Sequence, residues 1–380
     1  MRFFWDSFRR WGIRNMHEII ASSSRRGFMF GMGAAALGLS SRTLLAHDST
    51  APIVTFGMIT DCHYADIPAS GNRYYRESEA CLAECVAVMN AANVDFLIEL
   101  GDFKDLGASV KETFGFLSRI EQVFAGFAGP RYHVLGNHDM DCITKEQFMS
   151  AIENTGVEAA RPYYSFDLNG VHFVVLDANY REDGSDNFEG HKNWTLAYVP
   201  PPELQWLQED LVAAAPRPVI VFIHQLLDAD VGSYYVKNAA EVRQVLESCG
   251  RVRAVFQGHY HAGAYRYRRG IHYCTLKSVI EGSGPENNAF AVVRLYGDGR
   301  IVMQGYRREV NRTLIGMVSG NGVADPVSAV SSQIKVDTRS HHLLTNPQHE
   351  RLDTRSHTTD WSVARRLNTR KIVGTAIIIR

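Results

Sequence analysis

The segment Gly258-His259-Tyr260-His261 directs the interpretation of the whole chain. The apolar run over 252–256 before it predicts a buried strand, and Gly258 allows the backbone to turn sharply where that strand ends. After such a turn, His259 and His261 can face one cavity. Imidazole is the commonest metal ligand among side chains. Since paired histidines are also ordinary on protein surfaces, the segment needs support from elsewhere in the sequence.

Polar clusters follow four apolar runs upstream of this segment. The runs over 53–59, 96–98, 132–135 and 218–223 each predict a buried strand. The residues that come after them are Asp61 and His63, Asp102 and Asp105, the Asn137-His138-Asp139 cluster, and His224. Helical spacing over 77–92 and 110–124 predicts helices between the first three strands. This repetition indicates βαβ units, whose functional residues gather at the carboxyl ends of the strands.

The remaining pattern predicts further strands with helices outside them. Asn169-Gly170 is typical of a type I′ hairpin turn, and Pro201-Pro202 favours the start of a helix that continues over 203–214. A further helix is expected over 239–249. Further strands are expected over 163–168, 171–176, 264–268, 272–276, 290–296 and 301–306. We therefore expect two packed sheets flanked by helices.

Composition and charge limit the classes of function. The 380 residues, 45% of them hydrophobic, suffice for one large domain or two ordinary ones. The net charge of −1 combines +5 over 1–47, +4 over 316–380 and −10 over the middle of the chain. An acidic body lacks the basic surface that nucleic-acid binding requires. The six cysteines form no C-x-x-C motif, which argues against a disulfide scaffold.

The first 47 residues are arranged like a secretory signal. Arg25 and Arg26, followed by Gly-Phe-Met, precede a mild apolar run over 28–39 and a small-residue end near Ala46. The paired arginines resemble the twin-arginine export signal of bacteria. A run of about a dozen residues falls short of the roughly 20 that span a bilayer, so a membrane anchor is the weaker alternative. We expect export by the twin-arginine machinery to the periplasm or the cell exterior, without stable membrane insertion.

The C-terminal segment differs in character from the central domain over 48–315. From 316 to 380 it is polar and contains Asp-Thr-Arg-Ser-His twice, at 337–341 and 353–357. Before Ile372 it lacks the periodic apolar pattern of a folded core, so we expect a disordered tail. Its four histidines are expected to be solvated.

The strand-end clusters form one set when they are taken in chain order. They read D-x-H, G-D-x-x-D, G-N-H-D, a single histidine and G-H-x-H, and they span residues 61–261. This set resembles the calcineurin-like metallophosphoesterase superfamily. The resemblance implies that the domain over 48–315 is an α/β protein, a four-layer αββα sandwich of two mixed β-sheets flanked by helices.

The same resemblance implies two divalent metal ions. The ligands of one ion would be Asp61, His63 and His261. Those of the other would be Asn137, His224 and His259, and Asp102 would bridge both ions. Carboxylate, imidazole and amide ligands suit Mn, Fe or Zn, so the identity of the metals is open. A metal-bound hydroxide would attack the phosphorus of a phosphate ester or diphosphate. Taken alone, His224 could equally be a histidine of the core.

Two more residues have implied catalytic roles. His138 would be the general acid toward the leaving oxygen, and Asp105 would orient its imidazole. The protein-phosphatase branch of the superfamily continues G-D-x-x-D with an arginine that grips phosphate, whereas this chain has Leu106-Gly107. This departure argues against protein-phosphatase activity and leaves the role of Asp105 open. Asp139 is either a partner behind the ligands or a helix cap.

A narrower resemblance is to the manganese-dependent ADP-ribose/CDP-alcohol diphosphatases. It is carried by Ile59-Thr-Asp61, Tyr64-Ala-Asp66, Arg73-Tyr74-Tyr75-Arg76, Val279-Ile-Glu281 and Ala289-Phe290. That group typically has Gln where this chain has His63. Metal preference and substrate are therefore expected to differ between this chain and that group.

The stretch over 73–76 contains the candidate substrate contacts. Arg73 and Arg76 could clamp a second phosphate through bidentate hydrogen bonds, and Tyr74 and Tyr75 offer ring faces for stacking on a base. Alternatively, the stretch caps a helix and pairs with a nearby glutamate.

Together these features predict an exported dinuclear-metal hydrolase of phosphate esters or diphosphates, with a small nucleotide-like substrate. The same residues would also serve a general phosphomonoesterase or a cyclic or linear phosphodiesterase. Outside enzymes, the alternative is a degenerate ligand-binding module on the same scaffold. His133, His172 and His272 alternate within predicted strands, so we expect them to be structural.

Overall fold

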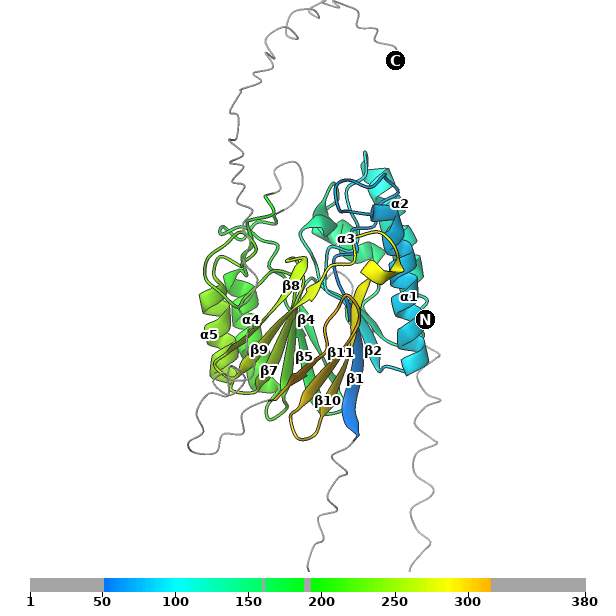
Figure 1. Cartoon of the computed structure of the whole chain (residues 1–380). Helices are drawn as coiled ribbons and strands as arrows, with labels where there is room; N and C mark the ends of the chain where they lie inside the picture. The colour runs from blue at the N-terminus through cyan, green and yellow to red at the C-terminus, as the bar shows by residue number, and fades with distance from the viewer. Residues whose placement is uncertain (1–50, 159–160, 188–192, 316–380) are drawn as a thin grey trace, which may run out of the picture. The chain divides into compact units, whose positions relative to one another are not determined.

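Strand β1 (Pro52–Ile59) lies inside the first of two six-stranded sheets. The computed structural model describes residues 51–158, 161–187 and 193–315, which belong to one unit (Figure 1). The other strands of this sheet are β2 (Phe96–Glu99), β3 (Arg131–His133), β10 (Ala289–Tyr296), β11 (Ile301–Arg307) and β12 (Arg312–Leu314). Their order is β12-β11-β10-β1-β2-β3. β1, β2 and β3 are parallel. β1 pairs with β10, β10 with β11 and β11 with β12, and these three pairs are antiparallel.

The second sheet is also mixed. Its strands are β4 (Tyr164–Leu168), β5 (Val171–Val175), β6 (Val219–Ile223), β7 (Val252–Gln257), β8 (Ala262–Arg268) and β9 (Ile271–Lys277). The order is β4-β5-β6-β7-β9-β8. The four inner strands are parallel, and β4 and β8 are antiparallel edge strands.

Aromatic rings fill the space between the sheets. Phe56 of β1 stacks on Phe96 with ring centroids 4.9 Å apart. It also meets Phe173, Phe222 and Phe256 of the second sheet edge to face, at 5.9, 5.7 and 5.9 Å. All five side chains are at most 1% exposed. Truncating one such phenylalanine to alanine typically costs about 3–5 kcal/mol, so these rings hold the two sheets together.

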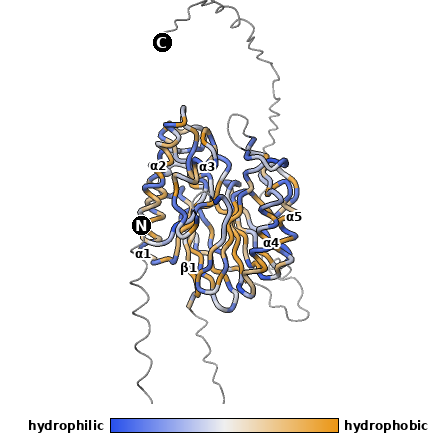
Figure 2. The backbone as a smooth tube through the Cα atoms, turned by 180° about the vertical axis from the view of Figure 1, so that it is seen from behind, coloured by the Kyte–Doolittle hydropathy of each residue, from blue (hydrophilic) through white to orange (hydrophobic). Residues whose placement is uncertain are grey.

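Helices cover the outer face of each sheet, which completes four layers. The first sheet packs against α1 (Ser78–Ala92), α2 (Val110–Phe124) and α3 (Lys145–Ala151). The second packs against α4 (Pro201–Ala213) and α5 (Ala239–Cys249). Short 3₁₀ helices are η1 (Tyr75–Glu77), η2 (His138–Met140) and η3 (Pro285–Asn287). Figure 2 shows that the strands between the helices are coloured mostly as hydrophobic. The predicted α/β four-layer αββα sandwich is confirmed.

Local sequence explains where several helices begin. Ser109 caps α2, because its side chain accepts a hydrogen bond from the Glu112 N–H at 3.2 Å. Thr144 and Gln147 form a capping box at the start of α3. α4 begins with Pro201-Pro202, where rigid φ angles suit a first turn. Neither α3 nor β12 was predicted, because both are too short to show a periodic apolar pattern.

Two predictions fall on other parts of the chain. The export signal over 1–47 and the polar tail over 316–380 lie outside the described residues, so both stay predictions. None of the helices in the described part combines the length and apolar character needed to cross a membrane.

Candidate metal centre

The candidate ligands lie on loops at the carboxyl ends of strands in both sheets. Asp61 and His63 follow β1, Asp102 follows β2, and Asn137 follows β3. His224 follows β6, His259 follows β7, and His261 directly precedes β8. Parallel strands end at one edge of a sheet, and here the same edge of both sheets is used. The loops are joined by backbone hydrogen bonds, among them His63 N–H to the Asp102 carbonyl at 2.8 Å and Gly258 N–H to the His224 carbonyl at 3.0 Å.

Four of these residues have a backbone conformation that side chains other than glycine rarely adopt. Their φ angles are 52° at Asp61, 46° at His63, 56° at Asp102 and 66° at His259. Each such conformation costs about 1–3 kcal/mol and persists only where the surroundings fix it. These turns are gathered at one edge of the sandwich, which is typical of a functional site.

Two glycines permit the close approach of these loops. A Cβ on Gly136 would lie 2.1 Å from the backbone nitrogen of Asp102, and one on Gly258 would lie 2.2 Å from Oγ1 of Thr60. Both separations are far shorter than a van der Waals contact. The close approach of the loops therefore requires glycine at both positions.

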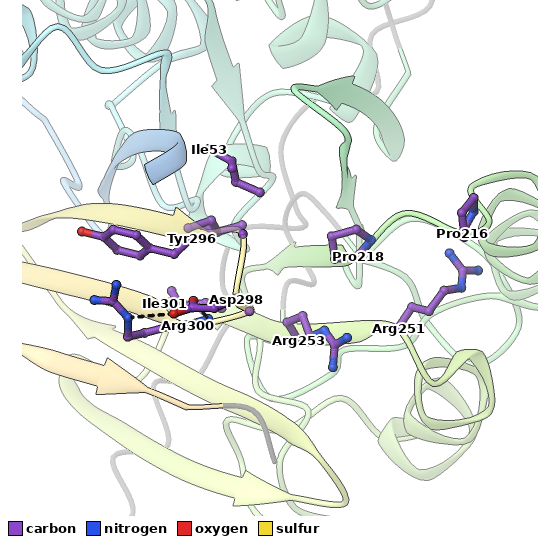
Figure 3. A pocket seen from close by; sticks show the side chains of 12 residues that line it. Ile53, Pro216, Pro218, Arg251, Arg253, Tyr296, Asp298, Arg300 and Ile301 are labelled. Carbon is purple, nitrogen blue, oxygen red and sulfur yellow. Dashed lines mark hydrogen bonds and ion pairs between the residues drawn. The ribbon is translucent and has the colours of Figure 1, made fainter. Parts of the chain in front are cut away.

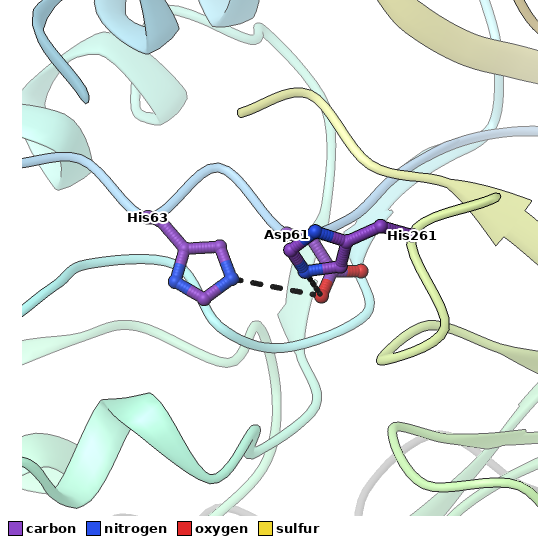
Figure 4. Close-up of side chains that lie close together, drawn as sticks. All are labelled: Asp61, His63 and His261. Atoms are coloured by element: carbon purple, nitrogen blue, oxygen red, sulfur yellow. Dashed lines mark ion pairs between the residues drawn. The ribbon is translucent and has the colours of Figure 1, made fainter. Parts of the chain in front are cut away.

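The first group of ligands comprises Asp61, His63 and His261 (Figure 4). Oδ2 of Asp61 accepts hydrogen bonds from Oγ1 of Thr60 at 2.7 Å and from the His259 N–H at 3.1 Å. Oδ1 of Asp61 instead faces Nε2 of His261 at 3.3 Å and Nε2 of His63 at 3.8 Å. One carboxylate oxygen thus holds the loops together while the other faces the imidazoles.

The second group comprises Asp102, His224 and His259. Oδ1 of Asp102 accepts the His138 N–H at 2.7 Å. Its Oδ2 lies 3.2 Å from Nε2 of His224 and 3.4 Å from Nε2 of His63. Asp102 therefore lies between the two groups, as a bridging ligand must. Nδ1 of His224 is 2.7 Å from the carbonyl of Leu100, so this nitrogen donates and Nε2 remains as the acceptor.

Unpartnered buried atoms test whether the residues fit a pair of metal ions. Within the described residues, buried side-chain atoms without a hydrogen-bond partner include Asp61 Oδ1, His63 Nε2, Asn137 Oδ1, His224 Nε2 and His259 Nε2. Those of Asp61, His63 and His224 have only the ion-pair contacts given above, and a buried polar atom without a hydrogen bond typically costs about 1–3 kcal/mol. A cluster of such atoms, all of types that bind Mn, Fe or Zn, fits metal ligation. Their assignment as ligands stays a prediction.

Charge balance at the centre agrees with this fit. Burial raises the pKa values of Asp61 and Asp102, but the facing imidazoles outweigh it and hold both well below their usual range. Burial lowers the pKa of His63, but carboxylates, first that of Asp102, raise it to about 10. Asp102 likewise overcomes burial and raises the pKa of His224 to about 9. Burial, with His224 nearby, lowers the pKa of His259 to about 3. Metal ions would replace the protons that balance these carboxylates.

Two carboxylates lie near the imidazole of His138. Nδ1 of His138 is 2.7 Å from Oδ2 of Asp141 but 3.8 Å from Oδ1 of Asp105. Asp141, directly after η2, is therefore the nearer carboxylate, while Asp105 also lies within ion-pair distance, so the orienting role of Asp105 stays a prediction. Nζ of the buried Lys104 donates to the carbonyls of His138 and Asp141 at 2.6 and 2.9 Å, which fixes this turn.

Asp105 and Asp139 have other neighbours. Oδ2 of Asp105 lies 3.3 Å from Nδ1 of His63, because the loop after β2 turns this carboxylate toward the first ligand group. Asp139 accepts the N–H groups of Asp102 at 3.0 Å, Phe103 at 2.9 Å and Gly136 at 2.8 Å. Asp139 thus supports the loop that carries Asp102.

The residues over 73–76, which were predicted to contact substrate, have different neighbours in the structure. Nη1 of Arg73 lies 3.9 Å from Oδ2 of Asp105, beside the centre. Arg76 instead pairs with Asp66, Nε to Oδ1 at 2.6 Å, and Tyr75 packs against the core under α1. The backbone N–H of Tyr74 donates to the Ile280 carbonyl at 2.9 Å. Within the described residues, Tyr74 has no hydrogen bond, ion pair or ring contact with the candidate ligands. Arg73 is thus the residue of the stretch whose side chain has an ion-pair contact beside the centre, and substrate binding by the stretch stays a prediction.

The glutamates after this stretch have other partners. Glu79 binds Arg119 through a pair of hydrogen bonds. Glu77 accepts from Oγ of Ser283 at 2.9 Å and from the Gly284 N–H at 2.8 Å. The alternative in which the stretch pairs with these glutamates therefore finds no support.

Three exposed aromatic rings beside His259 were not predicted. The rings of Trp194 and Tyr234 lie 5.9 and 5.4 Å from the His259 ring. Tyr234 also contacts Tyr260 at 5.0 Å and Trp194 at 5.4 Å. Trp194 is 40% exposed, and the two tyrosines are each 37% exposed. We call these three residues the aromatic cluster. Only Tyr260 was in a motif, because Trp194 and Tyr234 reach the centre through long loops without a sequence signal.

A separate pocket lies at the opposite edge of the sandwich. It has a volume of about 280 Å³ and is lined by the start of β1, the residues before β6, and the turn between β10 and β11 (Figure 3). Arg251, Arg253 and Arg300 are among its lining residues. These segments adjoin the amino ends of the parallel strands, so the pocket is not part of the candidate centre.

Two mixed sheets between helical layers, with buried carboxylates and imidazoles at the strand ends, define a metal-dependent phosphoester hydrolase. The chain belongs to the calcineurin-like phosphoesterase family, which it matches over residues 54–263. As a member of this family it is a hydrolase that uses two divalent metal ions, whose identity stays open. The alternative of a degenerate binding module is set aside.

Several relatives share one name. The manganese-dependent ADP-ribose/CDP-alcohol diphosphatase of Oryza sativa subsp. japonica is 27% identical over 292 residues, covering 66% of this chain and 90% of that protein. The protein of that name from Homo sapiens is 23% identical over 323 residues, covering 70% and 94%. The crystal structure of a dimetal phosphatase from Danio rerio has the same fold, with a TM-score of 0.62 at 24% identity, and covers 70% of this chain and 100% of that one. Both predicted resemblances are confirmed.

Proposed function

We propose that this chain is a diphosphatase of small nucleotide-like molecules and acts outside the cytoplasm. The observation that carries the substrate class is the aromatic cluster beside His259, with Arg73 also near the centre. Relatives named as diphosphatases of ADP-ribose and CDP-alcohols support it.

The candidate ligands come from two sheets and present oxygen and nitrogen atoms toward one another. Asp61, His63 and His261 would hold one ion, Asn137, His224 and His259 would hold the other, and Asp102 would be shared. When bound, such a pair of ions polarises phosphoryl oxygens and lowers the pKa of a bound water. The protein contributes fixed geometry, because the unusual backbone turns and the close-packed glycines leave the ligand loops little freedom.

His138 is the proposed general acid. Its Nδ1 is held by Asp141 at 2.7 Å, so Nε2 is the nitrogen that would give a proton to the leaving oxygen. Its ring lies 4.7 Å from the ring of His63, edge to face, and its side chain is 21% exposed. A general acid must reach both the centre and the substrate, and this position satisfies both conditions.

The two ends of a nucleoside diphosphate have complementary partners near the centre. The aromatic cluster offers flat faces, and stacking of a base on an aromatic side chain is worth about 1–3 kcal/mol. Arg73 offers a guanidinium that can hydrogen-bond to a phosphate oxygen. A simple phosphomonoester with no ring would leave the aromatic cluster without a role.

A substrate panel tests this proposal. With Mn²⁺ present, we expect hydrolysis of ADP-ribose and CDP-glycerol to exceed that of bis(4-nitrophenyl) phosphate and 4-nitrophenyl phosphate in kcat/KM. Dominant turnover of 4-nitrophenyl phosphate, with ADP-ribose untouched, would favour a phosphomonoesterase. Dominant turnover of the bis-aryl ester would favour a phosphodiesterase. Either result would reject the proposed substrate class.

Truncation of the aromatic cluster tests the base contact. Trp194→Ala should raise KM for ADP-ribose about 5–150-fold, as the loss of about 1–3 kcal/mol of stacking implies, and leave hydrolysis of glycerol 2-phosphate, which has no ring, unchanged. Tyr296→Ala is the matched control, because this tyrosine packs against Arg300 at the opposite edge of the sandwich. Equal changes for both substrates in the Trp194→Ala variant would show that the ring does not contact the base.

The proposed location follows from Arg25 and Arg26, which lie outside the described residues. Replacing both arginines with lysine should retain the protein in the cytoplasm, because the twin-arginine pair is the part of the signal that its export machinery reads. Cell fractionation with an antibody to the catalytic domain checks this. Recovery of the unaltered protein in the cytosol would reject export.

A further inference from the structure

Glu281 lies behind His261 and has no role in the proposed mechanism. Its Oε1 is 2.9 Å from Nδ1 of His261, and its side chain is 32% exposed. An imidazole nitrogen at this distance from a carboxylate donates its hydrogen, so the acceptor lone pair of His261 lies on Nε2. Nε2 is the nitrogen that faces Oδ1 of Asp61 at 3.3 Å. The contact with Glu281 therefore selects the tautomer in which His261 can bind a cation.

The backbone around Glu281 fixes it relative to the first ligand group. Ser278 N–H donates to the carbonyl of His261 at 3.1 Å, and Ile280 N–H donates to the carbonyl of Asp61 at 3.1 Å. Glu281 itself pairs with Arg73 in an antiparallel bridge. The strip over 278–282 thus connects the loop of Asp61, the loop of His261 and the stretch that carries Arg73. A side chain on such a strip is held at a defined place beside the imidazole.

Among the residues that the structure describes, the partner behind the corresponding histidine of the second ligand group is a backbone carbonyl and not a carboxylate. Nδ1 of His224 donates to the neutral carbonyl of Leu100 at 2.7 Å. A hydrogen bond to a carboxylate is roughly twice as strong as one between neutral groups, and it raises the basicity of the ligand nitrogen. The two groups are therefore supported differently, with the anionic partner on the side of His261.

We propose that Glu281 is a positioning residue that controls occupancy of the metal position formed by Asp61, His63 and His261. The proposal rests on the proposed function, in that the two ligand groups bind metal ions. Loss of a partner behind a metal ligand typically lowers affinity about 10–100-fold. We expect this loss at one of the two positions and none at the position formed by Asn137, His224 and His259.

Manganese binding to the metal-free full chain tests the proposal. Isothermal titration calorimetry of the unaltered protein should resolve two bound Mn²⁺ ions. Glu281→Gln keeps an acceptor oxygen without its charge, and Glu281→Ala removes both. The affinity for one ion should fall about 10-fold in the first variant and about 100-fold in the second. Glu286→Gln is the matched control, because Glu286 is an exposed glutamate of η3 in the same loop region.

Electron paramagnetic resonance separates positioning from a general structural role. With two equivalents of Mn²⁺, the unaltered protein and Glu286→Gln should give the spectrum of a spin-coupled pair. Glu281→Ala should give a single bound ion together with free Mn²⁺. Equal weakening of both ions, or unchanged binding in Glu281→Ala, overturns the proposal. Unaltered protein that binds no Mn²⁺ would instead reject the two-metal assignment itself. Circular dichroism melts of the metal-free variants should match that of the unaltered protein, and a lowered melting temperature also overturns a pure positioning role.

Discussion

The histidines around the centre use their two ring nitrogens for different purposes. His224 donates from Nδ1 to the Leu100 carbonyl, and His261 and His138 meet the carboxylates of Glu281 and Asp141 through the same atom. In His224 and His261, Nε2 faces a carboxylate of the centre. Because the outer contact sets the tautomer, the chemistry of each ring depends on the group behind it.

The contacts of His138 yield a prediction that separates two acidic residues. Asp141→Asn should lower kcat for ADP-ribose about 10–100-fold, because Nδ1 of His138 loses its charged partner. His138→Ala should lower it by about 10²–10⁴-fold. Steady-state kinetics at saturating Mn²⁺ measures both. With 4-nitrophenyl phosphate the losses should be smaller, since that leaving group needs little protonation.

Asp105→Asn is the control for this assignment. Its carboxylate lies 3.3 Å from Nδ1 of His63 and 3.8 Å from His138, so we expect weaker Mn²⁺ binding with kcat largely retained at saturating metal. Equal losses of kcat in Asp105→Asn and Asp141→Asn would contradict the assignment of Asp141 as the residue that orients His138.

A buried histidine away from the ligands gives a pH-dependent prediction. His133 lies 3.0 Å from Glu99 and 3.1 Å from Glu121. Burial lowers its pKa, but the two carboxylates, first that of Glu121, raise it to about 10. A histidine whose pKa is raised on folding contributes stability that is complete below about pH 6.5. That contribution is lost as the pH rises through about 10.

The His133→Gln variant tests this dependence. Below pH 6.5 it should be about 3–5 kcal/mol less stable than the unaltered protein, because it leaves buried carboxylates without a cation. The difference should shrink between pH 7 and 10, where the unaltered protein loses the protonated form of His133. Urea unfolding at a series of pH values measures it. A difference that stays constant across this range would show that His133 is neutral in the folded protein.

The sequence indicates which residues gather at the centre more clearly than it indicates which residues lie behind them. Asp61, Asp102 and His261 stand in short motifs at strand ends, so their meeting point follows from the order of the strands. Asp141 and Glu281 touch histidines through loop geometry that no local pattern encodes. Trp194 reaches His259 from 65 positions away in the chain and had no signal at all.

Long helices and strands could be predicted from their apolar residues, whereas short ones could not. The helix predicted over 110–124 matches α2, because its apolar residues repeat with helical spacing over 15 residues. α3 has seven residues and β12 has three, so neither is long enough for its apolar pattern to repeat recognisably. α3 does carry a capping box at Thr144 and Gln147, which is the one local signal that could have revealed it.

The glycine between β3 and η2 gives a prediction about how elements meet. Gly136→Ala would place a Cβ 2.1 Å from the backbone nitrogen of Asp102, so the loop after β2 must move. We expect a loss of about 1–3 kcal/mol in the free energy of unfolding, measured by urea denaturation, and weaker Mn²⁺ binding. Gly115→Ala is the control. A Cβ there meets nothing within 4 Å inside α2, so it should be stabilising by about 0.5–1 kcal/mol.

Two outcomes would contradict this account of Gly136. If Gly136→Ala binds Mn²⁺ with unchanged affinity, the loop of Asp102 can shift without disturbing the ligands. If Gly115→Ala destabilises the protein as much as Gly136→Ala, the loss reflects helix packing in general and not the close approach of two loops.

The candidate metal centre joins the two sheets of the sandwich. Asp61, Asp102 and Asn137 come from loops of the first sheet, and His224 and His259 come from loops of the second. Below the centre the sheets are held by apolar packing, such as that of Phe56 with Phe222. At the centre they meet through polar groups, several of which lack a hydrogen-bond partner within the described residues. Cations bound there would therefore link the two halves of the sandwich directly.

Metal removal should consequently lower the stability of the entire domain and not only its activity. A ligand present at 100 times its dissociation constant stabilises the folded state by about 2.7 kcal/mol for each site. For a domain of this size, each kcal/mol shifts the melting temperature by roughly 2–4 °C. We expect Mn²⁺ added to chelator-treated protein to raise the melting temperature by about 5–10 °C for one filled site, as measured by calorimetry. Asp102→Asn removes a charge that both ions would share, so its shift should be less than half as large. An equal shift in that variant would mean that Mn²⁺ binds elsewhere, because only ions held between the two sheets depend on the carboxylate that lies between both ligand groups.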